Sequence, residues 1–160
     1  MNKYILKIIA ACEVTGALLG MYILCRVIRS AHYDSDLIFV FFALICALSA
    51  MTVLALIAGI RLWMQRRLGL GLSLLVQILQ VPLLTSAIFK FQLMFGVGIW
   101  VYLSFDEKIT IGLPIKFGAA ENVAWNPDLP FSIGVNVLAL YFIYVLLRVM
   151  FARRETLTAP

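Results

Sequence analysis

Charged residues are scarce in this chain. They make up 13% of its 160 residues, about half the share found in ordinary soluble domains, whereas 64% of the residues are hydrophobic. A soluble domain of this length builds one core, and it cannot enclose four apolar stretches of about 20 residues each. The composition therefore predicts an integral membrane protein and leaves no room for an appended soluble enzyme.

Residues that carry catalytic or metal-binding chemistry are equally few. His32, beside Asp34 and Asp36, is the one histidine, and three such groups this close in a short loop are more typical of a solvated turn than of a metal site. No metalloprotease, serine-hydrolase or phosphate-binding motif is present. The cysteines all fall inside apolar runs, without disulfide or zinc spacing: Cys12, Cys25 and Cys46. We therefore expect no enzyme activity, cofactor or metal.

Four apolar runs are long enough to be membrane spans. They cover residues 4–28, 37–60, 68–86 and 131–150. The second run is the cleanest, because it has no charge and would be about 36 Å long as a helix. The runs predict a membrane α-helical fold, a four-transmembrane-helix bundle, formed by residues 1–160 as a single integral membrane domain.

The segment between the third and fourth runs has a different period. Every odd position is apolar from Phe89 to Phe105 and again from Ile109 to Phe117, on both sides of the charged Asp106–Lys108. This alternation predicts an extracytoplasmic β-hairpin within residues 88–126, turning at Asp106–Lys108, with its odd-numbered face covered.

Three residues add detail to the predicted hairpin. Gly96 and Gly98 indicate a bend or bulge, and Pro114 indicates an edge strand, because proline cannot donate a ladder hydrogen bond. The alternative is a fifth helix over Ile88–Phe105, which would leave no loop after the third span and would place the two chain ends on opposite sides of the membrane.

The basic residues give the orientation. With four spans, the inside segments hold eight of them: Lys3, Lys7, Arg61, Arg66, Arg67, Arg148, Arg153 and Arg154. The outside segments hold five, although the outside loop is far longer: Arg26, Arg29, Lys90, Lys108 and Lys116. The positive-inside rule predicts a multi-pass protein of the cell membrane, the inner membrane if the cell is Gram-negative, with both termini cytoplasmic.

One acid lies inside a predicted span. Glu13 is nine residues into the first run, about 13 Å below the cytoplasmic boundary, where a carboxylate is costly. Gly16 and Gly20 share its helical face, and in the third run Ser73, Gln77 and Gln80 form one polar stripe. Depth counting places Glu13, Thr52, Gln77 and Tyr141 in one candidate intramembrane polar layer, to which Gln80, one turn beyond Gln77, is added. We expect Glu13 to have a side-chain partner, with Gln77 the first choice.

Three short stretches carry a resemblance. They are Ala58-Gly59-Ile60-Arg61-Leu62-Trp63, Gly69-Leu70-Gly71-Leu72-Ser73 and Gln77-Ile78-Leu79-Gln80-Val81-Pro82. In them the chain resembles uncharacterised small four-span bacterial membrane proteins. The likeness covers the second and third runs, about a quarter of the chain, and implies no activity, cofactor or partner.

Two functions remain open from the sequence. The first is a non-enzymatic integral membrane protein, a subunit or interaction module whose apolar-faced hairpin docks on a partner or on the outer bilayer surface. The alternative is a small transporter or channel component in which Glu13 carries protons or binds a cation, as a homo-oligomer. Besides the lipid bilayer, the expected partner is a membrane protein or a second copy. Nucleic acid is not expected, because the basic residues only flank apolar runs.

Overall fold

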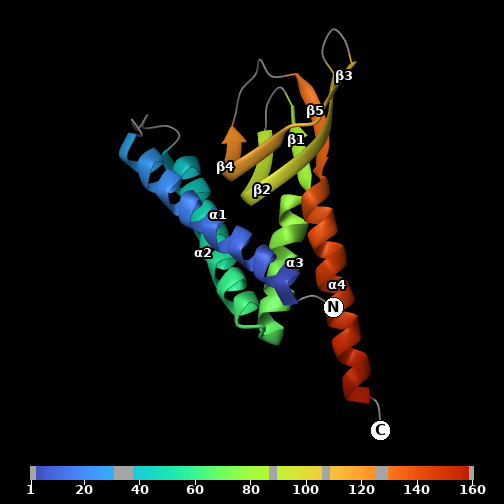
Figure 1. Cartoon of the computed structure of the whole chain (residues 1–160). Coiled ribbons are helices and arrows are strands. Elements are labelled where there is room, and N and C mark those ends of the chain that lie inside the picture. Colours follow the sequence, from blue (N-terminus) through green and yellow to red (C-terminus); the bar gives the residue numbers. More distant parts are fainter. Residues whose placement is uncertain (1–2, 31–37, 87–89, 106–108, 125–129, 159–160) are drawn as a thin grey trace.

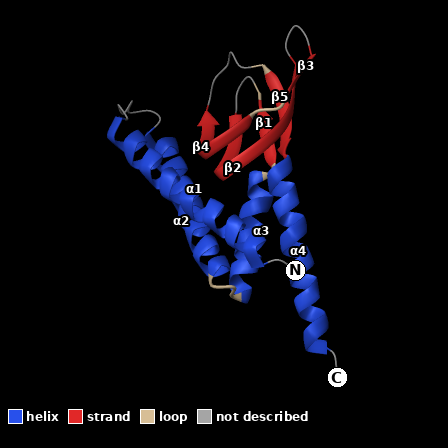
Figure 2. Cartoon of the chain, viewed as in Figure 1, coloured by secondary structure: helices blue, strands red, loops and turns tan. Residues whose placement is uncertain are grey.

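The computed structural model describes residues 3–30, 38–86, 90–105, 109–124 and 130–158 of the chain. These residues form four helices and one antiparallel sheet (Figures 1 and 2). The elements, in chain order, are α1 (Lys3–Ser30), α2 (Ile38–Trp63), α3 (Arg67–Gln80), β1 (Pro82–Thr85), β2 (Lys90–Phe105), β3 (Ile109–Gly112), β4 (Ile115–Ala124), β5 (Phe131–Asn136) and α4 (Val137–Thr158). His32 with its neighbouring acids, and the hairpin turn at Asp106–Lys108, lie outside the described residues.

Two of the helices, α1 and α2, are long and apolar enough to cross a membrane. The qualifying stretches are Tyr4–Arg29 and Phe42–Trp63, with mean hydropathies of 2.0 and 2.5. They overlap the first two predicted spans. The apolar helical stretches in the rest of the described chain, Arg67–Gln80 and Val137–Ala152, are shorter. Helix length and composition therefore give two candidate spans and do not confirm a bundle of four.

The third predicted span, residues 68–86, is only partly helical. Helix α3 ends at Gln80, where the backbone N–H of Val81 bonds to the carbonyl oxygen of Ile78 at 3.2 Å in a tightened last turn. Pro82 follows, and because it has no N–H it cannot continue the helix. The chain instead enters β1, which pairs with both β2 and β5. The prediction of a helix through Ser86 is therefore wrong.

The fourth predicted span, residues 131–150, likewise begins as a strand. Strand β5 occupies Phe131–Asn136, and α4 starts only at Val137. Asn136 marks the change, because its Oδ1 accepts a hydrogen bond from the backbone N–H of Ala139 at 3.2 Å and so caps the helix. The sheet therefore extends from Pro82 to Asn136, beyond the predicted bounds of 88–126 on both sides.

The predicted antiparallel hairpin is confirmed. Phe105 lies opposite Ile109 where β2 pairs with β3, and the same register continues along β4 until Lys90 lies opposite Ala124. Pro114, between β3 and β4, interrupts this outer strand. The alternative helix over residues 88–105 does not form.

The other strands close the sheet on itself. The first part of β2 pairs with β1, the last part of β2 pairs with β5, and β1 and β5 pair with each other. Figure 1 shows that β2 bends at its middle to make this possible. The backbone groups of β1 and β5 thus have partner strands on both sides. Among the described strands, the free edge is that of β3 and β4.

The burial of β2 corrects the prediction about its faces. The even-numbered Gln92, Met94, Trp100 and Ser104 are buried. The odd-numbered side is covered only before the bend, where Leu93 and Phe95 pack against the helices, in a cluster with Ala17, Ala55, Ala58 and Val76. After the bend it is only partly covered: toward the end of β2 Leu103 and Phe105 are exposed, and Phe117 on β4 is 78% exposed. The prediction of a covered odd-numbered face fails there because the even-numbered side chains point into the closed sheet instead.

The helices lie below and beside the sheet in Figure 1. The sheet sits at the upper ends of α3 and α4, while α1 and α2 pack together and lean away to one side. The start of α1 and the end of α4 lie on the side away from the sheet. The bend of β2 contacts the middle of α1, at Gly16, and this contact joins the helix pair to the sheet.

Candidate functional site

Glu13 is fully buried between α1 and α3, where two side chains bond to its carboxyl group. Ser73 Oγ donates to Oε2 at 2.7 Å, and Gln77 Nε2 donates to Oε1 at 2.9 Å. The two donors are one helical turn apart on α3, so a single face of that helix holds both carboxyl oxygens. The expected side-chain partner of Glu13, Gln77, is confirmed, and Ser73 of the same stripe is a second partner.

The residue of α2 that lies beside Glu13 is not the one predicted by counting residues from the cytoplasmic ends of the spans. A Cβ built on Gly59 would lie 3.1 Å from the Cβ of Glu13. Thr52 is seven residues, or about 10 Å, further along α2. The helices α1 and α2 are staggered, since Lys7 Nζ lies 5.5 Å from the centre of the Trp63 ring. The prediction assumes that Tyr4 and Ile60 lie at the same depth. Thr52 is buried, as expected, but it is not level with Glu13.

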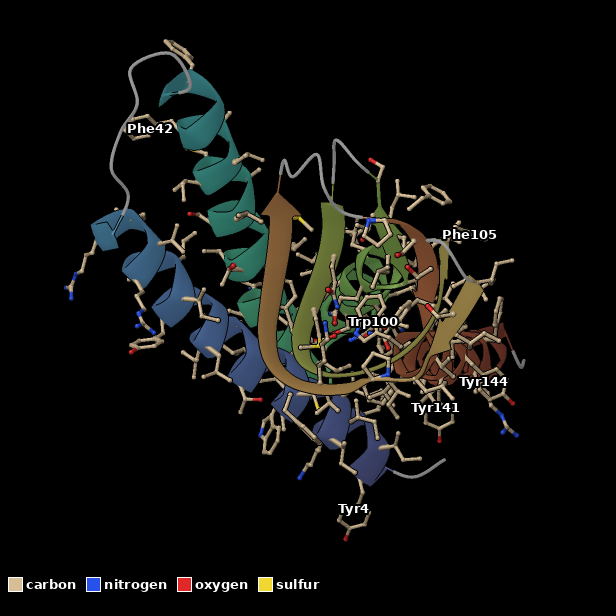
Figure 3. All side chains as sticks on the ribbon, turned by 90° about the horizontal axis from the view of Figure 1, so that it is seen from above. Tyr4, Phe42, Trp100, Phe105, Tyr141 and Tyr144 are labelled. Atoms are coloured by element: carbon tan, nitrogen blue, oxygen red, sulfur yellow. The ribbon has the colours of Figure 1, made fainter. Side chains whose placement is uncertain are left out.

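Tyr141 does not belong to the interior. Its side chain is 49% exposed on α4, and its ring centre lies 6.1 Å from that of Phe142; Figure 3 shows it pointing away from the sheet. The prediction placed it by depth alone, and depth does not determine which face of a helix a residue occupies.

Gln80 links the helices to the sheet. It is buried at the end of α3, and its Oε1 accepts a hydrogen bond from the backbone N–H of Phe95 on β2 at 3.0 Å. This is one turn beyond Gln77, so the polar stripe of α3 runs from Glu13 to the bend of β2. Gln80 was predicted to be in the polar layer, but its bond to the sheet was not.

The interior of the closed sheet holds polar side chains beside a small apolar cluster around Trp100. Trp100 is fully buried there, and Figure 3 shows it within the sheet from above. Asn136 lies opposite Trp100 in the pairing of β2 with β5, and its Oδ1 also accepts from the backbone N–H of Ile99 at 3.3 Å. At the end of β2, Ser132 donates to Ser104 at 2.9 Å.

Among the residues that the structure describes, four buried side-chain nitrogens in the sheet and at the end of α3 have no hydrogen-bond partner. They are Gln80 Nε2, Gln92 Nε2, Trp100 Nε1 and Asn136 Nδ2. Backbone donors hold the oxygen atoms of Gln80 and Asn136, which fixes their nitrogens as the free ends. An unpaired buried donor costs about 1–3 kcal/mol. The interior therefore offers N–H groups to hydrogen-bond acceptors. The sequence signal for it was the even-numbered polar positions of β2.

The outer face of the closed sheet is apolar and exposed. Ten residues of β2, β3, β4, β5 and the β3–β4 connection form it, and we call them the outer face: Leu103, Phe105, Ile109, Ile111, Leu113, Ile115, Phe117, Phe131, Ile133 and Val135. Each of them except Leu113 pairs with another odd-numbered residue on a neighbouring strand. Because paired residues point to the same side of a sheet, they share one side. The sheet thus combines an apolar exterior with an interior in which buried polar side chains lie beside a small apolar cluster.

These features define what the chain can do chemically. Glu13 can hold a proton or accept hydrogen bonds, but among the described residues no group of three metal-ligating side chains is found near it or elsewhere. A single buried acid without a second catalytic group is thin support for an enzyme. The outer face offers contact area and no reactive group. No protein-family model, no curated protein and no solved structure matches the chain.

Proposed function

We propose that this chain is a non-enzymatic, multi-pass protein of the cell membrane, a subunit or interaction module that acts through its extracytoplasmic sheet. The outer face is the observation that supports this role. It exposes ten apolar side chains on one side of a sheet, and soluble proteins rarely leave so large an apolar area uncovered. In the membrane this surface is covered.

The proposed topology has four crossings with both termini in the cytoplasm. The up-and-down order of the four helices supports it, because α1 and α4 begin and end on the side away from the sheet (Figure 1). The link between α2 and α3 lies on that same side and carries Arg61, Arg66 and Arg67. Basic residues favour the cytoplasmic side.

Labelling of single cysteines tests this topology. In a background with the three native cysteines changed to alanine, we expect cysteines at Thr158 and Arg66 to react only after the cells are opened. A cysteine at Glu107 should react with an impermeant maleimide in intact spheroplasts. Reaction of the Thr158 position from outside would contradict four crossings.

If lipid or protein covers the outer face, cysteines on that face should react more slowly with a water-soluble reagent than cysteines on the opposite side. Thr110 and Phe117 are both exposed in the structure, but Thr110 lies on the opposite side of the hairpin from the outer face. We expect a cysteine at Thr110 to react with the impermeant maleimide in spheroplasts, and one at Phe117 to be protected at least tenfold in rate. Equal rates at the two positions would show that water reaches the face, and the proposed role would fail.

A small transporter or channel component using Glu13 is the second candidate. The hydrogen bonds of Glu13 to Ser73 and Gln77, and the link from Gln80 to β2, favour it. Buried polar groups then continue from Glu13 along α3 to the polar side chains buried in the sheet. Intramembrane acids often mark ion or proton pathways. Proteoliposomes that show no proton or cation flux above protein-free vesicles would remove this candidate.

A further inference from the structure

The contact between the sheet and α1 lies at the middle of a candidate span. A Cβ built on Gly16 would lie 2.0 Å from the backbone nitrogen of Gly96, so the two backbones touch. Gly16 is twelve residues from the start and thirteen from the end of the stretch Tyr4–Arg29, which is about 18 Å and 20 Å along the helix. If α1 crosses the bilayer, the bend of β2 therefore lies near its centre.

Helix α3 and the apolar stretch of helix α4, Val137–Ala152, are each too short to cross alone, although α4 as a whole has 22 residues. The 14 residues of α3 reach about 21 Å, against a hydrocarbon core of about 30 Å. The four residues of β1 add about 13 Å directly after it. In the same way, the six residues of β5 add about 20 Å before α4. A strand and a helix in series supply the length that each apolar helical stretch lacks.

The sheet also meets the chemical conditions of the hydrocarbon core. Only helices and closed sheets satisfy their backbone groups without water, and β1, β2 and β5 close on themselves. The remaining free edge is that of β3 and β4: β4 contacts α1, and β3 lies at the end of the sheet that is farthest from the helices, where we place the headgroups. The exposed outward side chains are largely apolar, and the buried polar side chains of the strands point inward beside a small apolar cluster, an arrangement close to that of membrane barrels. Lys116 is the exposed charged side chain among those the structure describes on the strands, and its long stem can reach the headgroups.

The apolar surface is continuous from the strands to the helices. Val135 at the end of β5 is followed by Val137, Leu140 and Tyr144 on α4, all of them exposed. At the connection from α3 to β1, the exposed side chain of Ile78 on α3 is followed by the exposed side chain of Leu84 on β1. A surface that must contact lipid along α3 and α4 therefore runs onto the sheet without a polar boundary.

We infer that the outer face is covered by the acyl chains of the outer leaflet, so that the chain crosses that half of the bilayer partly as a closed β-sheet. This inference rests on the proposed function and names the partner of its sheet. It places the sheet inside the leaflet, whereas the hairpin period alone suggested a sheet outside the membrane. The bend at Gly96 is the deepest point, and the hairpin rises from it toward the headgroups.

Spin labels on the full-length protein test the inference in vesicles of phosphatidylethanolamine and phosphatidylglycerol. Cysteines at Ile111, Ile115 and Phe117 carry the label on the outer face, and a cysteine at Thr110 is the matched control on the opposite side. Collisions with oxygen report lipid, and collisions with a water-soluble nickel chelate report water. We expect oxygen to dominate at Phe117 and Ile115, with depth decreasing from Phe117 to Ile111, which lies six residues or about 20 Å further along the hairpin. Nickel should dominate at Thr110.

Three other outcomes have different meanings. If nickel dominates at all four positions, the face is open to water, and both the proposed function and the inference fail. If neither reagent reaches Phe117 and Ile115, protein covers the face: the inference fails, while the interaction module stands. A uniform depth from Phe117 to Ile111 would also overturn the inference, because the hairpin would then lie flat on the surface.

Discussion

Replacing Gly16 by leucine should detach the sheet from α1 and lower the free energy of unfolding by about 3 kcal/mol. The side chain would enter the space held by the backbone of Phe95 and Gly96, with its Cβ 2.3 Å from the carbonyl carbon of Phe95. Backbone atoms cannot move aside as a flexible side chain can. Gly96 is equally constrained, because its φ of +93° is rarely adopted by residues with a side chain, and its Cβ would lie 2.4 Å from the carbonyl oxygen of Cys12.

The measurement is reversible unfolding in mixed micelles, followed by tryptophan emission in a background where Trp63 and Trp125 are changed to phenylalanine, so that the buried Trp100 is the reporter. Gly71→Ala is the matched control, because nothing lies within 4 Å of a Cβ at Gly71 in α3. That change should leave stability unaltered or raise it by up to about 1 kcal/mol. Wild-type stability in Gly16→Leu would show that α1 and β2 do not pack together as the structure has them.

Removing the Glu13 carboxyl should have the second large effect. In Glu13→Ala, the Ser73 hydroxyl and the Gln77 amide lose their acceptor inside the helix bundle. Unpaired buried donors cost about 1–3 kcal/mol each in soluble proteins, and interhelical hydrogen bonds in membranes are weaker, so we expect a loss of about 2–4 kcal/mol. Steric trapping in bicelles measures it. A loss below about 0.5 kcal/mol would contradict the buried hydrogen bonds.

Glu13→Gln is the conservative variant. Its amide oxygen can accept from Gln77, and its amide nitrogen can donate to Ser73, whose hydroxyl reverses its role. Stability should therefore remain within about 1 kcal/mol of wild type. A transporter that moves protons or cations through Glu13 should lose its flux in this variant while still assembling. A purely structural Glu13 should leave both assembly and function intact.

The sequence by itself determined the two helices that are long and apolar enough to cross a membrane, the hairpin and the pairing of Glu13. Each depends on a local pattern: long uncharged runs, a period of two on both sides of a charged turn, and polar residues three or four apart on α3 that must face a buried acid. In these cases local chemistry leaves one stable arrangement.

Only the tertiary structure decided which face of the hairpin is buried and where the last two helices begin and end. A period of two shows that one side is apolar, but not whether water, protein or lipid lies on that side. Likewise, Leu83 and Leu84 are apolar enough for a helix, yet they form β1 because β2 and β5 offer it hydrogen bonds on both edges. Closure of the sheet joins strands distant in sequence, and for that reason it turned Trp100 and Gln92 inward and left Phe117 outside.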